Sequence, residues 1–469
     1  MAAVAAARLG QRAGPAIRNQ YRLAIAIGLF AVLLVSGGAS RSDEPLQLAA
    51  RLAAIVALVA TLWPLKLPRL PSAGRWLAGV AALYALILLQ LVPLPPDLWA
   101  SLPGHDLYAR IAEQSRVVAW RPLSLTPDLT LNALFALLPA TALGLASLYL
   151  DSRARSRLWL VIVAGAVASA AIGMLQMASG GNGRRLYGEP SADSAVGIFA
   201  NRNHQMAVLA CALPLLGALA AGAYSRGSAT ALRIAVAAGS ALLLLVGIVL
   251  TGSRSGLVLA PVGLAGAWMA LRSAGVRLLP ADGWKRTAIA GGAAAILLAL
   301  AAVGGRSGVL ERVSHTDLAS ESRTQMLPPM IETAKAFMPT GAGFGSFNAV
   351  YRRFEPDSLL STIYMNQAHN EPLQLAIEGG IPALALLLLF LFWWGRTSAA
   401  IVAASPPADR RPIAIATLTV TAILMAESLV DYPLRTPLLG GLFVLACLEM
   451  ARSTAPRVRS SAAAAADRN

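Results

Sequence analysis

Apolar runs of membrane-spanning length recur along this chain, and they restrict the fold more than any other feature. A transmembrane helix needs about 20 predominantly apolar residues. The run 372–395 has that length and carries no charge after Glu378. Twelve such segments are expected, centred in 21–39, 46–64, 75–94, 129–149, 157–178, 204–224, 231–251, 254–272, 286–304, 372–395, 412–431 and 434–451.

Composition supports the same fold class. Hydrophobic residues make up 57% of the chain and charged residues 13%, whereas soluble domains carry roughly 25% charged residues. The basic N-terminus and the apolar run 23–37 look like a signal peptide, but many spans follow, which favours an uncleaved first helix. Cys211 and Cys447 lie in apolar runs and are expected to be buried residues outside any disulfide. The sequence therefore predicts an all-α polytopic membrane protein with about 12 transmembrane helices.

The distribution of basic residues predicts the orientation of the spans. If the N-terminus is inside, the inside connections are short and almost purely basic, while the longer outside connections hold most of the acids. This pattern satisfies the positive-inside rule. Both termini are then cytoplasmic, and the connections near 95–128, 179–203 and 305–371 lie outside. Because the basic residues are scattered over short loops instead of forming one stripe, nucleic acid is excluded as a partner.

The expected organisation has five parts. They are a basic cytoplasmic N-terminus (1–20), nine transmembrane helices (21–304), a large outer loop (305–371), three transmembrane helices (372–451) and a disordered cytoplasmic tail (452–469). Loops longer than about 12–15 residues usually carry function or structure of their own. The large outer loop is expected to contain short helices, because 321–338 has a helix-like pattern before the glycine turn 340–347.

Histidines and arginines gather at the outer ends of the predicted spans. Arginine binds phosphate oxygens through its planar fork of N–H donors. A pocket built from these residues would be electropositive and suited to a phosphate group. The candidates are His204, His315 and His369, with Arg202, Arg254, Arg323 and Arg435.

Each arginine also has a purely structural interpretation. Arg254 lies in the tight turn "TGSRSG", where its side chain could extend to lipid headgroups or hold a phosphate, and both remain open. Arg435 follows Asp431 across a turn, which favours an ion pair that closes the hairpin. The glycine turn "GAGFG" has no preceding strand and is weak evidence for a nucleotide site.

The stretch "FANRNHQ" opens a predicted span with three polar side chains. A helix cap explains Asn203, but a cap alone does not explain Arg202 and His204 beside it. The cluster is therefore a candidate part of the site.

His369 stands at the start of an apolar helix. Asn370 or Glu371 can cap that helix, and Pro372 suits its first turn. The positive end of the helix dipole keeps a neighbouring imidazole neutral at pH 7, and a general base must be neutral. Exposure of the Glu378 carboxylate to lipid would have a high free-energy cost, so Glu378 is expected to face protein or water. It could orient His369 or an arginine, or form a purely structural pair, and the structural role is favoured.

Other chemistries lack their signatures in the sequence. The outer loops contain no acidic pair or His/Cys cluster at ligand spacing, so no metal site is expected. No G-x-S-x-G turn is present for serine hydrolysis.

At these residues the chain resembles the O-antigen ligase family, which includes O-antigen ligases, O-antigen polymerases and protein O-oligosaccharyltransferases. The similar segments are "LVPLPPDLWASLPG" (91–104), "GIFANRNHQMAVLA" (197–210), "TGSRSG" (251–256), "ESRTQML…GAGFGSF" (321–347), "AHNEPLQLAIEGGIPA" (368–383) and "SLVDYPLRTPL" (428–438). The family pattern of His-Asn, nine residues and Gly-x-x-Gly/Thr/Tyr fits His369, Asn370 and Gly380. It departs at the last position, which is Ala383.

The resemblance implies a GT-C-type glycosyltransferase of the bacterial inner (cytoplasmic) membrane, with 305–371 as a large periplasmic loop. Its donor would be a glycan on undecaprenyl diphosphate, and its acceptor a hydroxyl of lipid A-core, another glycan or a protein. His369 would be the catalytic base, and Arg202, Arg254 and Arg323 would bind the diphosphate. Asn203, His204, Asn370, Glu378 and Arg435 would support the site, with membrane lipids around it and neither metal nor cofactor.

Two rival functions remain at this point. One is a polymerase or a transferase to protein within the same family, which differs only in the acceptor. The other is a transporter of lipid-linked glycan, which should show interrupted spans and ionisable groups near the midplane. Arg51, Glu427 and Glu449 are the main intramembrane candidates, and their spacing suggests no relay.

Overall fold

Helices make up almost all of the ordered structure. The computed structural model describes residues 15–41, 43–63, 71–179, 184–188, 194–276, 318–360, 365–403 and 406–455. The longer helices are α2 (Pro15–Ser36), α3 (Leu46–Leu62), α4 (Pro71–Leu89), α7 (Pro127–Ala136), α8 (Leu138–Leu148), α9 (Ser152–Ala178), α10 (Arg202–Ser225), α11 (Ala231–Thr251), α12 (Arg254–Ser273), α15 (Leu318–Phe337), α17 (Glu371–Ala403), α18 (Arg411–Glu427) and α19 (Pro437–Ser453). The short elements are α5 (Pro96–Ala100), α6 (Asp106–Gln114), α16 (Phe347–Tyr351), η1 (Asp357–Leu359), η2 (Pro433–Arg435), and β1 (Pro93–Leu94) paired with β2 (Arg121–Pro122).

Seven helices in the described residues are long and apolar enough to cross a membrane. They are α2, the continuous pair α7–α8, α9, α10, α11, α12 and α17, and each coincides with a predicted span. The chain is therefore an all-α, multi-pass membrane protein, as the sequence predicted. The number twelve stays a prediction. The segments 46–64, 75–94, 412–431 and 434–451 form the shorter or less apolar helices α3, α4, α18 and α19, and 286–304 lies outside the described residues.

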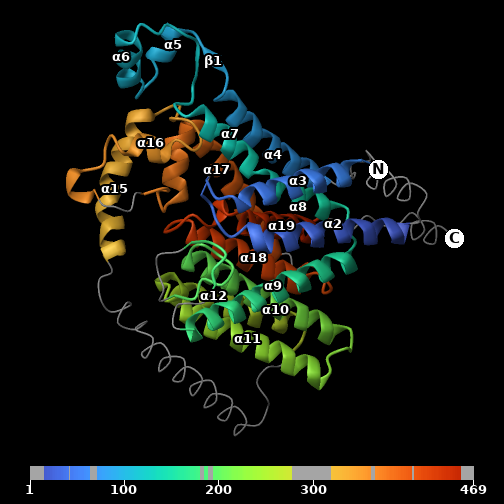
Figure 1. Ribbon diagram of the computed structural model, residues 1–469. Coiled ribbons are helices and arrows are strands. Elements are labelled where there is room, and N and C mark those ends of the chain that lie inside the picture. Colours follow the sequence, from blue (N-terminus) through green and yellow to red (C-terminus); the bar gives the residue numbers. More distant parts are fainter. Residues whose placement is uncertain are drawn as a thin grey trace, which may run out of the picture.

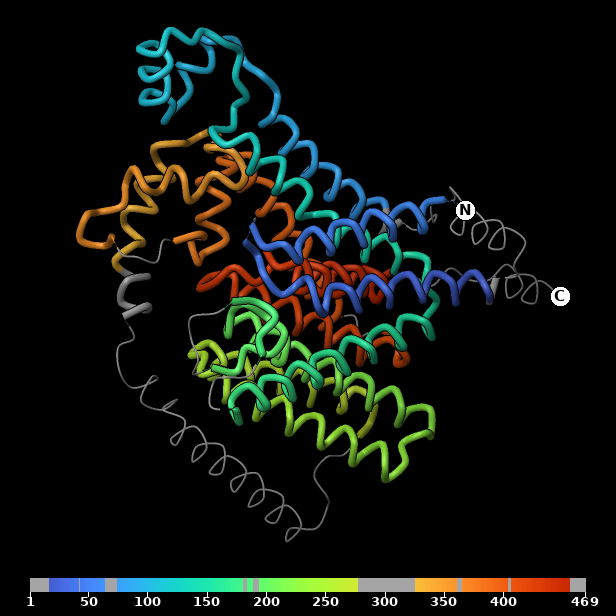
Figure 2. Tube along the Cα trace, viewed as in Figure 1, coloured from blue at the N-terminus to red at the C-terminus, as the bar shows by residue number. Residues whose placement is uncertain are grey.

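The helices pack into a bundle with a continuous apolar core. Figure 2 shows α9–α12, in green, grouped along one side, with α18 and α19, in red, between them and the N-terminal helices. Small residues permit close approach: at Gly217 a Cβ would lie 2.7 Å from Ala267 Cα, and at Gly263 it would lie 2.6 Å from the Ala210 carbonyl oxygen. Such small-residue contacts are the usual way in which membrane helices approach each other.

One end of the bundle, here called the basic end, joins the start of α2, the α8–α9 connection and the end of α19. Asn19 Nδ2 donates to Asp151 Oδ2 (2.8 Å), and Asp151 caps α9 by accepting from Ala154 N. Arg155 Nε lies 2.9 Å from Glu449 Oε2. This pairing gives Glu449, an intramembrane carboxylate in the sequence analysis, a structural partner.

The opposite end, here called the loop end, joins the end of α2 with the starts of α10 and α19. Ala200 N donates to Gly38 O (3.2 Å), and Leu438 N donates to Gly37 O (3.1 Å). A Cβ on Gly38 would lie 3.0 Å from Phe199 Cα, so glycine permits this close passage of the two chain segments. The bundle therefore brings segments that are far apart in sequence to one surface.

Two excursions of the chain lie at the loop end. The insert (residues 93–122) contains β1, α5, α6 and β2, and the arm (residues 318–360) contains α15, α16 and η1. Figure 1 shows both beyond the same end of the bundle, with α5 and α6 displaced to its side. Arg353 Nη1 and Nη2 lie 3.3 Å from the two carboxylate oxygens of Asp106, which ties the arm to the insert.

Helix α17 is broken near its start. Gly380 has φ 58° and ψ −151°, a conformation outside the helical region that glycine adopts readily. The glycine turn of the arm occupies the break: Ile381 N donates to Pro339 O (2.9 Å), and Gly343 N donates to Glu378 O (2.9 Å). The turn thus satisfies backbone groups that the break leaves unpaired. The contact with α17 requires glycine at position 341, whereas a Cβ at Gly343 or Gly345 would meet Ser124 or Leu129.

Candidate active site

A buried carboxylate at the loop end is in contact with polar residues from three helix connections. Asp431 lies between α18 and η2 and has no exposed surface. Its Oδ1 lies 3.6 Å from His204 Nε2 and 3.3 Å from His369 Nδ1. The structure therefore brings together two predicted site histidines that are separated by 165 residues along the chain, positions 204 and 369.

The remaining acceptor positions of Asp431 are also occupied. Asn203 Nδ2 donates to Oδ2 (2.6 Å), and Asn201 Nδ2 approaches the same oxygen (3.3 Å). The backbone N–H of Tyr432 donates to Oδ1 (2.9 Å). Burial alone would raise the pKa of Asp431, but the adjoining imidazoles of His204 and His369 hold that pKa well below its usual range. The carboxylate is therefore ionised under physiological conditions.

The ring of Tyr432 lies against both imidazoles. Its centroid is 5.1 Å from that of His204 and 4.7 Å from that of His369, and both contacts are edge-to-face. Such contacts fix ring orientation as well as position. Asp431 and Tyr432 lie in the segment 428–438 that carried part of the family resemblance, but the sequence did not indicate their roles.

Accessibility distinguishes the two histidines. The His369 side chain is 18% exposed, and that of His204 is 2% exposed. His369 also has φ 49°, a left-handed conformation that few non-glycine residues adopt. Such backbone outliers concentrate at functional sites. His369 is thus the histidine that a substrate can reach.

The residue after His369 has the predicted capping role. Asn370 Oδ1 accepts from Leu373 N (2.9 Å), and Asn370 Nδ2 donates to Leu429 O (3.0 Å). Asn370 therefore starts α17 and attaches it to the end of α18. This attachment places His369 against Asp431.

At the start of α10 the capping prediction was wrong by two residues. The cap is Asn201, whose side chain accepts from Asn203 N (2.8 Å). Asn203 does not cap the helix, because its side-chain amide donates to Asp431 instead. Arg202 is the first residue of α10, and its side chain is half-buried.

The prediction that Arg435 pairs with Asp431 was also wrong. Arg435 Nη2 lies 3.1 Å from Glu378 Oε2, because the turn η2 directs the guanidinium toward α17 while Asp431 is occupied by other groups. Gln374 Nε2 donates to the second oxygen of Glu378 (2.9 Å). Of the roles foreseen for Glu378, the structure shows the pairing with an arginine.

Arg254 is the first residue of α12 and follows the cap Ser253, which comes directly after the left-handed Gly252 (φ 62°) that ends α11. Its side chain is half-buried. Two residues later, a Cβ on Gly256 would lie 3.1 Å from Met206 Cγ, so the first turns of α10 and α12 are side by side. Arg202 and Arg254 therefore lie at two adjacent helix starts on the loop end. Position 323 belongs to α15, but its side chain lies outside the described part of the chain, as does His315.

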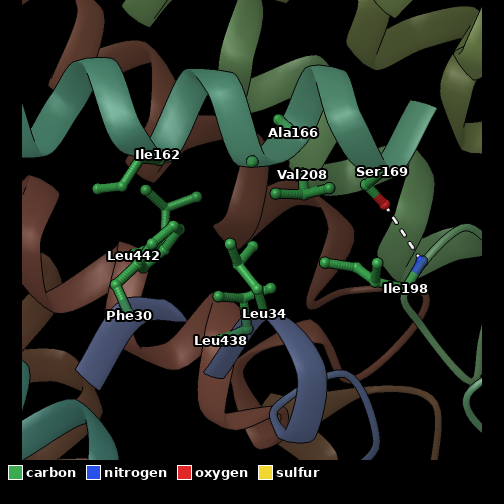
Figure 3. Close-up of a pocket in the computed structure, with 10 residues that line it drawn as sticks. Phe30, Leu34, Ile162, Ala166, Ser169, Ile198, Val208, Leu438 and Leu442 are labelled. Atoms are coloured by element: carbon green, nitrogen blue, oxygen red, sulfur yellow. Dashed lines mark hydrogen bonds between the residues drawn. The ribbon is translucent and has the colours of Figure 1, made fainter. Parts of the chain in front are cut away.

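An apolar pocket lies within the bundle, among α2, α9, α10 and α19 (Figure 3). Its polar lining group is Ser169, whose Oγ accepts from Ile198 N (3.2 Å). The residues that line this pocket include no titratable side chain. Within the described residues no group of three His, Cys, Asp or Glu side chains could hold a metal ion.

Comparison with known proteins agrees with the motifs found in the sequence. The family model described as "O-Antigen ligase" matches residues 239–388, a segment that includes Arg254, His369, Asn370 and Glu378. A comparison with curated proteins finds no match. The match covers the break in α17 and the glycine turn that fills it, while Asp431 and the start of α10 lie outside it. Residues 239–388 thus confirm the resemblance of this multi-pass membrane protein to the O-antigen ligase family.

Proposed function

We propose that this protein is an O-antigen ligase-like glycosyltransferase that transfers a glycan from undecaprenyl diphosphate to a hydroxyl of lipid A-core. The observation that carries the proposal is the partly exposed His369, which lies in the segment that the family model matches and whose Nδ1 faces the buried carboxylate of Asp431. A histidine oriented by a carboxylate is a recurrent general base.

The Asp431 carboxylate determines which nitrogen of His369 acts. When Nδ1 carries its proton toward Asp431, Nε2 on the other side of the ring holds a lone pair. Nε2 takes the proton of the acceptor hydroxyl, and the acceptor oxygen attacks the anomeric carbon. The bond from that carbon to the diphosphate oxygen breaks, with inversion, and the electron pair leaves with the diphosphate. Asp431 stabilises the imidazolium formed in this step.

The leaving diphosphate needs positive groups where its charge develops. Arg202 and Arg254 open α10 and α12, so each combines a guanidinium with the N–H groups of a helix start. Helix starts and arginines both favour phosphate oxygens. We assign these two residues to the diphosphate, with Arg323 as a third ligand. His204, Asn203, Asn370, Glu378 and Arg435 hold the surrounding structure, and the reaction proceeds without metal or cofactor.

Charge supports the orientation of the protein in a bacterial inner membrane. The basic end carries Arg18, Arg22, Arg153, Arg155 and Arg452 near the helix ends that meet there. The positive-inside rule places such an end in the cytoplasm. Both chain termini are then cytoplasmic, and the loop end with His369 is periplasmic, where a lipid-linked donor presents its diphosphate at the membrane boundary.

The acceptor distinguishes this proposal from its closest rivals. An O-antigen or exopolysaccharide polymerase, or a protein O-oligosaccharyltransferase, would use the same donor chemistry. A transporter of lipid-linked glycan is less supported, because the carboxylate–histidine cluster lies at a helix-end surface and not at mid-span.

The decisive experiment reconstitutes the purified protein with glycan on undecaprenyl diphosphate and offers three acceptors separately: lipid A-core, a second lipid-linked glycan, and protein. We expect glycan transfer to lipid A-core and release of undecaprenyl diphosphate. Transfer only to a lipid-linked glycan identifies a polymerase, and transfer only to protein identifies an oligosaccharyltransferase. Movement of intact lipid-linked glycan without bond cleavage overturns the proposal.

A further inference from the structure

The insert carries an exposed apolar edge that the proposed reaction does not use. Val118 is 85% exposed, more than any other large hydrophobic side chain in the described residues, and Trp120 is 64% exposed. Val117 beside them is 49% exposed. Val118, the most exposed of these apolar side chains, lies outside the membrane helices. Contact with lipid would be the ordinary explanation for an exposed apolar side chain on a membrane helix, but Val118 is not on one.

The local backbone presents these side chains as an edge. Residues 117–120 follow the end of α6 without helical structure, and Arg116 just before them has φ 54°. Val117 N donates back to Ala112 O (2.9 Å), which closes the helix end. A left-handed residue at this position is usually glycine. Here the chain keeps an arginine next to its most exposed apolar residues.

The other face of the insert is firmly packed. Trp99 is 5% exposed, its indole N–H donates to Pro122 O (2.8 Å), and its ring lies edge-on to His105. A Cβ on Gly104 would collide with the Phe337 ring of the arm. The insert is thus a structured unit that rests on the arm, so the exposure of Val118 and Trp120 is a property of its outer edge.

The chain enters the insert from another exposed apolar segment. Leu88, Leu89 and Val92, at the end of α4, are 49%, 65% and 48% exposed. The insert begins at Pro93 and ends at Pro122, five residues before the membrane helix pair α7–α8, so both of its ends are tethered to the bundle surface. Figure 1 shows α5 and α6 at the loop end, displaced to the side of the bundle.

The residue types fit the boundary between headgroups and acyl chains. Tryptophan is enriched there because its ring is apolar and its N–H is polar. Arginine next to apolar residues reaches phosphate groups while its stem stays in the apolar layer. The exposed Arg116 directly precedes the run Val117–Trp120 and supplies that complement to lipid phosphates, whereas the Arg121 guanidinium stacks over the Trp99 ring.

We infer that the edge formed by Val117, Val118 and Trp120 is a membrane-surface anchor, which inserts into the headgroup–acyl boundary of the leaflet at the loop end. Interfacial segments of this kind are buried about 5–10 Å into that boundary. The anchor also fixes the arm relative to the bilayer, because Asp106 of the insert binds Arg353 of the arm. The inference does not depend on the proposed reaction.

The test measures depth in the membrane with a fluorescent label. Cys211 and Cys447 are replaced by alanine, Val118→Cys is labelled with a nitrobenzoxadiazole group, and the protein is reconstituted into phosphatidylethanolamine–phosphatidylglycerol vesicles. Ser358→Cys, at an exposed polar position in η1, is the matched control. Quenching by lipids with a nitroxide near the start of the acyl chain is compared with quenching by aqueous iodide.

We expect the label at position 118 to emit at shorter wavelength, and to be quenched several-fold more by the nitroxide lipid than the label at 358. Quenching by iodide should show the reverse order. Equal iodide quenching at both positions overturns the inference. A label at 118 that is shielded from both quenchers also overturns it, because protein then covers the edge.

A second measurement uses no label. Brominated lipids quench tryptophan by contact, so Trp120→Phe should remove part of the lipid-dependent quenching. Trp99→Phe, at a buried indole of the same insert, should leave that quenching unchanged. Loss of the same fraction in both variants contradicts an anchor at Trp120.

Discussion

Three buried carboxylates lie near the start of α17, and two of them, Asp431 and Glu378, have partners that differ in kind. Asp431 is surrounded by two imidazoles, amides and a backbone N–H. Glu378 binds the Arg435 guanidinium, the Gln374 amide and a distant backbone N–H of Phe347 (3.4 Å). The first carboxylate faces two imidazole rings, a side chain that enzymes use for proton transfer, and the second faces a guanidinium.

This difference in partners suggests a catalytic role for Asp431 and a structural role for Glu378. A carboxylate that contacts a partly exposed imidazole can direct a proton transfer. A carboxylate that contacts arginine beside a broken helix can only hold charge and shape. The pair therefore predicts that removal of Asp431 mainly lowers activity, and removal of Glu378 mainly lowers stability.

The largest effect is expected at His369. His369→Ala removes the proposed base and should lower transfer roughly 10²–10⁴-fold, the usual contribution of a general base. Transfer to lipid A-core by reconstituted protein is the measurement. His105→Phe is the control, because His105 is a buried histidine of the insert that contacts Trp99. Full activity of His369→Ala would place the base elsewhere.

Asp431→Asn should come next. Loss of a group that orients a functional side chain typically lowers activity about 10–100-fold. The asparagine keeps the shape but loses the charge that stabilises the imidazolium, so kcat should fall while KM stays similar. A change confined to KM would assign Asp431 to substrate binding instead.

Glu378→Gln should leave kcat nearly unchanged and lower the free energy of unfolding. Breaking a fully buried ion pair costs about 3–5 kcal/mol, and we expect about 2 kcal/mol here because the Arg435 side chain is 23% exposed. Glu378→Gln with Arg435→Gln should cost less than the sum of the single changes. Additive losses would show that the two residues act separately.

Acid should remove the stabilisation that Asp431 provides. The pKa of Asp431 in the folded protein lies well below its usual value of about 3.9. The unfolded chain therefore binds more protons, and the stability contributed by Asp431 is present above about pH 4 and lost as the pH falls toward the folded pKa. Asp431→Asn should flatten the fall in unfolding temperature at acidic pH. An unchanged slope would show that other groups cause it.

The smallest effect is expected from chelation. Because neither proposed role uses a metal, ethylenediaminetetraacetate should leave transfer within about twofold of the untreated rate, well below the contribution of a catalytic metal. A loss that added Mg²⁺ restores would require a metal in the reaction.

The sequence predicted the membrane-spanning helices and the position of His369 at a helix start. Apolar length predicted the seven long spans, and the position of His369 before Pro372 predicted a polar residue at a helix start. These features are local, so one stretch of sequence contains them. The motifs also predicted the family to which residues 239–388 match.

The partners of those residues could not be predicted locally. Asp431 lies four residues from Arg435, so an ion pair across the turn was the natural expectation. Tertiary contacts decided otherwise, because α10 and α17 bring their histidines to Asp431 and α17 brings Glu378 to Arg435. The break at Gly380 was missed for a similar reason: its partner is a turn about 40 residues earlier, at Pro339–Gly343.

The backbone hydrogen bonds between that turn and α17 limit how the two segments can move relative to each other. Ala342 N and Gly343 N donate to Ile377 O and Glu378 O, and Ile381 N returns a bond to Pro339 O. A Cβ on Gly341 would lie 2.5 Å from Glu378 O, so neither backbone leaves space for slippage. The arm and the first turns of α17 should therefore move as one rigid body. Their shared amides should exchange hydrogen slowly and together.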